Sequence, residues 1–179
     1  MKKLTLESMM TLLLAVVFSM SFTSCGSDSD DDSTGSGKAT MTIDGKSYSM
    51  PYAYYVPGGE SEDGVIMFSN LNIMNPSSIS RDSKWTYCVI NIKGLSGTTI
   101  PTGEFTSTVE CFVNQDLQGS SLEIGVGCRG NVVVSKSGNG YSLTFTSTLI
   151  EDFEGVSNVS SVSISFSGTL IDSSSIWQD

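Results

Sequence analysis

In the second half of the chain, apolar and polar residues alternate with a period of two. The apolar side chains of 122–128 alternate with Glu and Gly, and those of 141–149 and 162–170 alternate with Ser and Thr. Because a strand points successive side chains to opposite faces of its sheet, each segment has one apolar face and one polar face. The pattern predicts antiparallel strands that are buried on one side and solvated on the other.

Turn residues separate the predicted strands. Asp44-Gly45 stands between two short alternating runs and predicts a type I′ hairpin turn, and Ser137–Gly140 holds a second turn sequence. Val65–Met74 and Trp85–Ile92 carry apolar groups on both faces, so we expect them in the middle of the structure. The predicted strands are 39–43, 47–55, 65–74, 84–93, 104–114, 121–129, 131–136, 141–150 and 159–171.

Nine antiparallel strands within residues 38–179 can bury a complete core either as two packed sheets or as a closed barrel. We predict an all-β domain, a single antiparallel β-sandwich of about nine strands. A lipocalin-like β-barrel is the alternative, because the last four predicted strands follow one another as a simple meander.

The N-terminal segment has a different character. Lys2 and Lys3 precede an apolar run over 9–18, and small residues then lead to Cys25. The run covers about half of the ~20 residues that a membrane-spanning helix needs, so it predicts an export signal. Phe22-Thr23-Ser24-Cys25 resembles the lipobox of bacterial lipoproteins, although Leu is usual where Phe22 stands. The resemblance implies a signal peptide over 1–24 and a lipid anchor on Cys25.

An acidic segment follows Cys25. Residues 26–32 have no apolar side chain and cannot bury surface, so we predict a flexible tether over 25–37. Its aspartates resemble the acidic signal that sends Bacteroidota lipoproteins to the cell surface: Asp28, Asp30, Asp31 and Asp32. Asp32-Ser33-Thr34 resembles the short O-glycosylation sequence of the same phylum, with Ser33 as the acceptor. The resemblance implies an outer-membrane, cell-surface protein that is attached to the membrane through Cys25.

Composition narrows the function classes. The chain of 179 residues holds 33 serines, 16 threonines and 18 glycines, and it has no histidine. The net charge of −10 argues against a nucleic-acid partner, because phosphate binding needs a clustered basic face. The missing histidine excludes Ser-His-Asp and Cys-His catalysis and His-ligated zinc. We expect no enzyme activity and no cofactor.

Three cysteines remain in the domain. Cys88, Cys111 and Cys128 each share parity with apolar neighbours, which predicts that they point inward as small hydrophobic residues. Export permits disulfides, and one disulfide with one free thiol allows three pairings. The wide spacing of the cysteines does not predict a zinc site.

Tyrosines gather where the second predicted strand lies. Tyr48, Tyr52 and Tyr54 share parity, and Tyr55 points the other way. Aromatic rings on a sheet face can stack on sugar rings, although tyrosines also cover edge strands. We retain Tyr48, Tyr52 and Tyr54 as candidate ligand-binding residues.

Two acidic loops, Glu60–Gly64 and Glu151–Gly155, do not fit the EF-hand pattern. We interpret them as solvated turns rather than as calcium ligands or a glycosidase dyad, and we expect no metal site.

These features predict a surface-anchored lipoprotein whose β domain is a non-catalytic binding module for a glycan or another extracellular ligand. One alternative is a structural subunit of an outer-membrane or fimbrial complex, which would offer an edge strand to a protein partner. Another is a lipocalin-like carrier of an apolar ligand, which needs an open interior.

Overall fold

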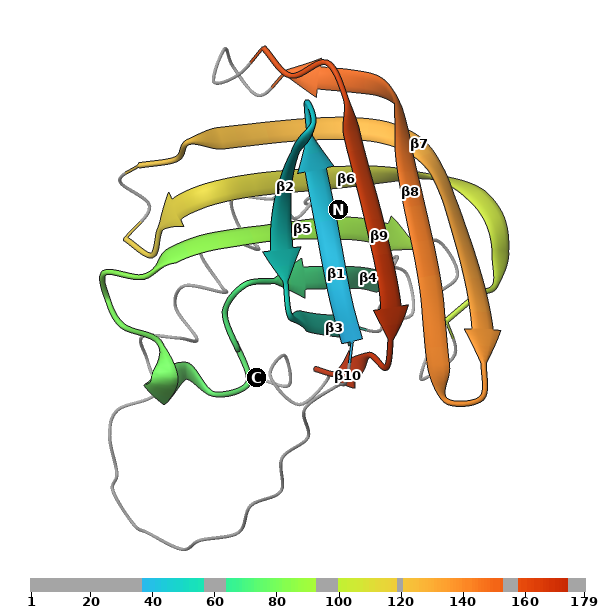
Figure 1. Cartoon of the computed structure of the whole chain (residues 1–179), viewed down its shortest axis with the longest axis horizontal. Helices are drawn as coiled ribbons and strands as arrows, with labels where there is room; N and C mark the ends of the chain where they lie inside the picture. Colours follow the sequence, from blue (N-terminus) through green and yellow to red (C-terminus); the bar gives the residue numbers. More distant parts are fainter. Residues whose placement is uncertain (1–36, 57–63, 93–99, 119–120, 153–157, 174–179) are drawn as a thin grey trace, which may run out of the picture.

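The computed structural model describes residues 37–56, 64–92, 100–118, 121–152 and 158–173. These residues form an all-β structure, as predicted, in which one 3-10 turn, η1 (Pro76–Ser78), interrupts the strands (Figure 1). The strands are β1 (Gly37–Ile43), β2 (Lys46–Met50), β3 (Tyr52–Val56), β4 (Gly64–Ser69), β5 (Lys84–Ile92), β6 (Gly103–Asp116), β7 (Ile124–Ser137), β8 (Gly140–Asp152), β9 (Val162–Gly168) and β10 (Ile171–Asp172).

All ten strands belong to one hydrogen-bonded sheet in the order β10-β3-β4-β5-β6-β7-β8-β9-β1-β2. Neighbouring strands are antiparallel except β3 and β10, which are parallel. The expectation of a purely antiparallel arrangement is therefore wrong at this edge. The sheet curls into a half-barrel, and Figure 1 shows β1, β2 and β9 crossing in front of β5 and β6 at a steep angle.

The concave side of the curled sheet holds the main core. Buried side chains from β1 to β9 form one cluster there. The rings of Phe68 on β4 and Phe166 on β9 lie 5.0 Å apart, so side chains from the two halves of the sheet meet. Phe145, Ile66 and Ile90 are fully buried in the same cluster. These contacts across the interior remove the predicted apolar faces of the strands from water, which stabilises the fold.

A second core lies on the outer face of β3 to β6. The Trp85 and Tyr87 rings lie 4.2 Å apart, and Tyr87 stacks on Phe112 at 4.8 Å. Partly buried side chains of the segment that joins β4 to β5 cover these rings, including Leu71 and Met74. This second layer explains why β4 and β5 are apolar on both faces and confirms their predicted place away from the edges of the sheet.

Several predicted strand boundaries are wrong, each for a local reason. Pro51 interrupts the single strand predicted over 47–55, because proline lacks the N–H that a continuous ladder needs, and β2 and β3 result. The strands predicted over 121–129 and 131–136 are one strand, β7, which continues through a register shift at Arg129/Gly130. The strand predicted over 65–74 ends at Ser69, and that over 159–171 divides into β9 and β10.

The β1–β2 turn has the predicted conformation. Asp44 and Gly45 have φ values of 47° and 81°, as a type I′ turn requires. The Asp44 carboxylate also accepts hydrogen bonds from the backbone N–H groups of Ser160, at 3.0 Å, and Ser161, at 2.8 Å. The Ser160 hydroxyl donates to the same carboxylate, and this bond together with the backbone bonds lowers the pKa of Asp44. The turn is thereby tied to the start of β9.

Candidate functional site

The candidate tyrosines do not share one face. Tyr48, on β2, packs against the main core, and the Lys46 ammonium lies 5.1 Å from the centre of its ring. Tyr52 and Tyr54, on β3, pack in the outer core instead. After Pro51 the chain joins the sheet near its other end, as β3. The parity that Tyr48 shares with the other two tyrosines in the sequence therefore does not put the three on one face. The shared face that their parity predicts for Tyr48, Tyr52 and Tyr54 is therefore wrong.

Tyr54 has a structural role. Its side chain is fully buried, its hydroxyl donates to Asn72 Oδ1 at 3.2 Å, and it accepts from the Ile73 N–H at 3.1 Å. Burial raises the pKa of Tyr54 above its ordinary value. These bonds fix the segment that covers the outer core, and they leave no surface on Tyr54 for a sugar ring.

Tyr55 faces the main core, as its opposite parity predicts. Its hydroxyl donates to Asp172 Oδ2 at 2.8 Å. Burial, and then this hydrogen bond, raises the pKa of Tyr55 to about 12. Ser173 donates through both its N–H and its hydroxyl to the Tyr55 carbonyl, so the C-terminal strand is bound to β3.

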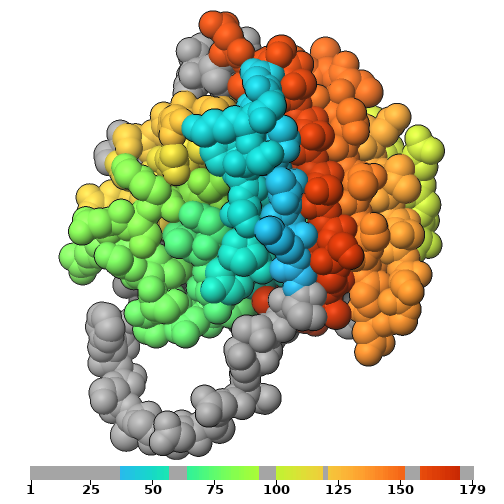
Figure 2. Space-filling view, in the orientation of Figure 1, coloured from blue at the N-terminus to red at the C-terminus, as the bar shows by residue number. Residues whose placement is uncertain are grey.

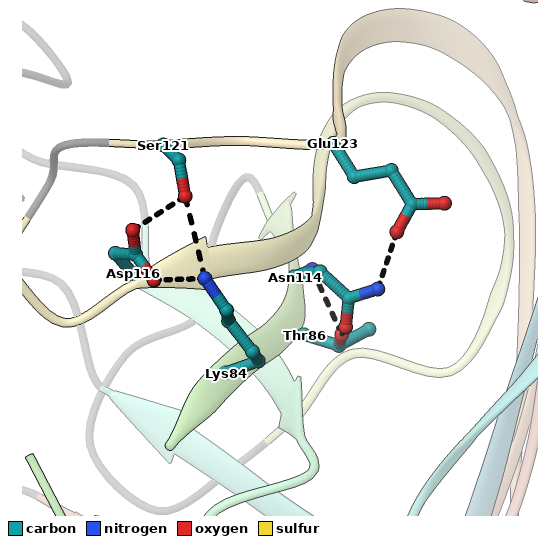
Figure 3. A network of polar contacts seen from close by, with 6 residues as sticks. All are labelled: Lys84, Thr86, Asn114, Asp116, Ser121 and Glu123. Carbon is teal, nitrogen blue, oxygen red and sulfur yellow. Dashed lines mark hydrogen bonds and ion pairs between the residues drawn. The ribbon is translucent and has the colours of Figure 1, made fainter. Parts of the chain in front are cut away.

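A polar cluster lies where β5 begins and β6 ends (Figure 3). Lys84 forms an ion pair with Asp116 and lies 3.4 Å from the Ser121 hydroxyl, which itself donates to Asp116. An open hollow of about 280 Å³ borders the cluster, lined by Arg81, Asp82, Lys84, Asp116 and Gln118. Two cations and two carboxylates line it, so the hollow has no strong preference for the charge of a ligand.

Beside this cluster, Asn114 occupies a bulge in β6 with a φ of 52°. Its backbone N–H donates to the Thr86 hydroxyl at 3.2 Å, and its side-chain amide donates to Glu123 (Figure 3). Glu123 also accepts from Lys46 of β2 at 3.2 Å. The bond from Asn114, and then that from Lys46, lowers the pKa of Glu123. Glu123 thus connects one end of the sheet to its middle, a contact that no local sequence pattern signals.

A regular polar surface lies on the convex side of β8, β9, β1 and β2, the strands that lie side by side across the view in Figure 2. Two rows of hydroxyl residues run across the four strands, and each residue of a row is the register partner of the next. The first row is Thr144, Ser165, Thr40 and Ser49, and the second is Thr146, Ser163, Thr42 and Ser47. Ser142 and Ser167 pair in a third row, which continues to Lys38 on β1. We name these ten residues the hydroxyl face.

The ten residues of the hydroxyl face carry no charge, and the exposed Lys38 borders them beside Ser167. Eight of its side chains are exposed, and Thr40 and Thr42 are half-buried. Strand spacing places the hydroxyl groups of one row about 4.8 Å apart, and alternate residues along a strand about 6.6 Å apart. Thr42 and Ser47 already hydrogen-bond to each other at 3.1 Å. The arrangement offers a grid of donors and acceptors with no carboxylate inside it. The alternation of serine and threonine in the sequence predicts each strand's contribution but not the grid.

Other predicted sites lie outside the described residues: Cys25, Asp28, Asp30, Asp31, Asp32, Ser33 and most of the two acidic loops. Within the described part of the chain, no three Cys, Asp or Glu side chains gather as metal ligands would. The same residues include no helix that is long and apolar enough to cross a membrane.

Fold and surface together define an all-β protein with one curled sheet, a filled concave core and an uncharged hydroxyl-rich face. No family model matches the chain, and no significant match was found among curated proteins or solved structures.

Proposed function

We propose that this protein is a surface-anchored lipoprotein whose β domain binds a neutral glycan without transforming it. The hydroxyl face is the observation that carries the binding proposal. Hydroxyl groups both donate and accept hydrogen bonds, which matches the hydroxyl groups of a polysaccharide. Residues 38–179 hold 7 basic and 14 acidic side chains, so the domain repels anionic partners overall. A face of ten hydroxyl groups with no carboxylate among them favours a neutral partner on such a domain.

The filled interior supports the predicted β-sandwich over the alternative of a lipocalin-like carrier. Twenty-four buried residues pack together on the concave side, and the Phe68 and Phe166 rings meet across it. A lipocalin-like carrier needs an interior open enough for its ligand. We therefore interpret the curled sheet as two packed halves and place the binding function on the outer surface.

The anchoring part of the proposal rests on the sequence. Cys25 would carry the lipid, and Asp28, Asp30, Asp31 and Asp32 would direct export to the cell surface. Cys25→Ala should release the protein from membranes, because stable anchoring needs lipid chains. Membrane fractionation of the variant tests this, and continued association of Cys25→Ala with membranes would contradict it. Deleting 28–32 should leave the protein lipidated but protected from external protease on intact cells.

The binding part is tested by removing hydroxyl groups while keeping side-chain shape. Thr144 and Ser165 lie opposite each other in the first row of the hydroxyl face. In the variant Thr144→Val/Ser165→Ala we expect retention on insoluble neutral polysaccharides, such as cellulose, xylan and starch, to fall about tenfold. A loss of two hydrogen bonds of about 0.5–1.5 kcal/mol each gives that factor.

The matched control is Thr102→Val/Ser80→Ala, which makes the same two changes at exposed positions outside the hydroxyl face. This control should bind like the unaltered protein. An equal loss in both variants, or no retention of the unaltered protein on any neutral polysaccharide, would refute the proposal. In that case β2, an edge strand among the residues that the structure describes, would make a protein partner the next candidate.

A further inference from the structure

Three thiol groups form a row inside the main core. Cys88 on β5, Cys111 on β6 and Cys128 on β7 point into the concave side from adjacent strands. Their exposed fractions are 0%, 0% and 2%. The prediction that all three point inward is confirmed, and they lie side by side.

The three possible pairs differ in geometry. Cys88 and Cys111 are direct register partners in the antiparallel pair β5–β6. Residues in that relation have Cα atoms about 4.5–5.5 Å apart, within the range of about 4.4–6.8 Å that a disulfide spans. Cys128 is the register partner of Val109, two residues before Cys111, so it lies diagonally across from Cys111. Diagonal neighbours are about 7–8 Å apart, and Cys88 and Cys128 are separated by a whole strand.

The side chains agree with the register. The Cys111 thiol interacts with both the Cys88 and the Cys128 thiols. The bond from Cys128 lowers the pKa of Cys111, but the bond with Cys88 and burial outweigh it and hold that pKa well above its ordinary value. Burial in the closed core and a raised pKa make the Cys111 thiol slow to react, so we expect oxidation after β5 and β6 have paired and before the rest of the sheet covers them.

We propose that Cys88 and Cys111 are joined by a disulfide in the exported protein, and that Cys128 stays a free thiol. The thiolate of one cysteine attacks a disulfide of a dithiol oxidase and forms a mixed disulfide. The thiolate of the second then displaces the oxidase, which leaves as a dithiol that takes up the two protons. The oxidising compartment follows from the export part of the proposed function. The choice of pair follows from the register alone.

Mass spectrometry of the exported full-length protein tests the pairing. Free thiols are alkylated under denaturing, non-reducing conditions, and the chain is then cleaved after Lys, Arg and Glu. These cuts place the three cysteines in separate peptides, Trp85–Lys93, Cys111–Glu123 and Ile124–Arg129. We expect the first two peptides to be cross-linked and only Cys128 to be alkylated. Three alkylated cysteines, or a cross-link that includes Cys128, would overturn the proposal.

Oxidative refolding of the same chain in a glutathione buffer separates this proposal from the question of export. Formation of the Cys88–Cys111 bond in the buffer, with three free thiols in the protein from cells, would show that the geometry is right and that the protein does not reach an oxidising compartment. This outcome overturns the disulfide in the exported protein together with the export proposal. Failure of the bond in both samples would overturn the choice of pair alone.

Single substitutions add a stability readout. Reductant should lower the unfolding temperature of the unaltered protein and of Cys128→Ala by several degrees. It should leave Cys88→Ala and Cys111→Ala unchanged, because neither can form the bond. If reductant does not lower the unfolding temperature of Cys128→Ala, the pairing of Cys88 with Cys111 is overturned. If Cys88→Ala and Cys111→Ala do not fold, the cross-linked peptide of the unaltered chain still decides.

Discussion

Gly130 is a position at which the backbone of the neighbouring strand leaves no room for a side chain. It lies in β7 beside the register shift between β7 and β8. A Cβ atom built there would lie 2.1 Å from the Thr146 carbonyl oxygen and 2.8 Å from a ring carbon of Phe145. Ordinary contacts between such atoms are about 3.5 Å, so Gly130→Ala requires β7 and β8 to separate by more than an ångström.

The cost of Gly130→Ala follows from that separation. Overpacking in a well-packed region costs about 1–3 kcal/mol, and one weakened ladder hydrogen bond adds about 1 kcal/mol. The alanine also lowers the conformational entropy of the unfolded chain, which restores about 0.4–1 kcal/mol of the free energy of unfolding. We therefore expect a loss of about 2–3 kcal/mol in the free energy of unfolding. For a domain of this size, that loss corresponds to about 6–12 °C in the unfolding temperature.

Chemical and thermal unfolding, followed by circular dichroism, measures this loss. The matched control is Gly140→Ala, at the β7–β8 turn, where the nearest atoms to an added Cβ lie 3.5 Å away. Gly140→Ala should change the unfolding temperature by less than about a third of the Gly130→Ala effect, because 3.5 Å is an ordinary contact. If the two variants unfold together, the close approach of β8 to Gly130 does not determine stability, and the reasoning fails.

Two further predictions concern ionisable groups. Burial raises the pKa of Glu110, so its charged form opposes folding: stability is highest below the ordinary pKa of 4.5 and falls as the pH rises through the folded-state value. Urea unfolding of Glu110→Gln should show higher stability than the unaltered protein at pH 7 and equal stability at pH 4; equal values at both would contradict the assignment. Tyr55→Phe removes the bond to Asp172 and should cost about 1–2 kcal/mol at pH 7. Because the pKa of Tyr55 is raised to about 12, the unaltered protein should lose part of its free energy of unfolding as the pH rises from 10 to 12. A pH series on Tyr55→Phe should not show this loss.

The sequence by itself determines the class of fold and the face on which most side chains lie. Strict alternation places Phe145 and Ile164 in the core and Thr144 and Ser165 in solvent, because a period of two leaves a strand only these two faces. Asp44-Gly45 determines a turn, because its backbone angles suit those two residues and few others.

Tertiary structure alone decides how the strands come together. Gly130 looks like a strand boundary in the sequence, yet β8 packs so close to it that the missing side chain lets β7 continue. Pro51 separates Tyr48 from Tyr54 and sends them into different cores.

The hydroxyl face and the row of thiols likewise arise only from register. Thr144 and Ser165, or Cys88 and Cys111, lie more than twenty residues apart in the chain, and only the pairing of strands makes them neighbours. The physical reason is that alternation acts within a strand, whereas register depends on the packing of all the strands around one core.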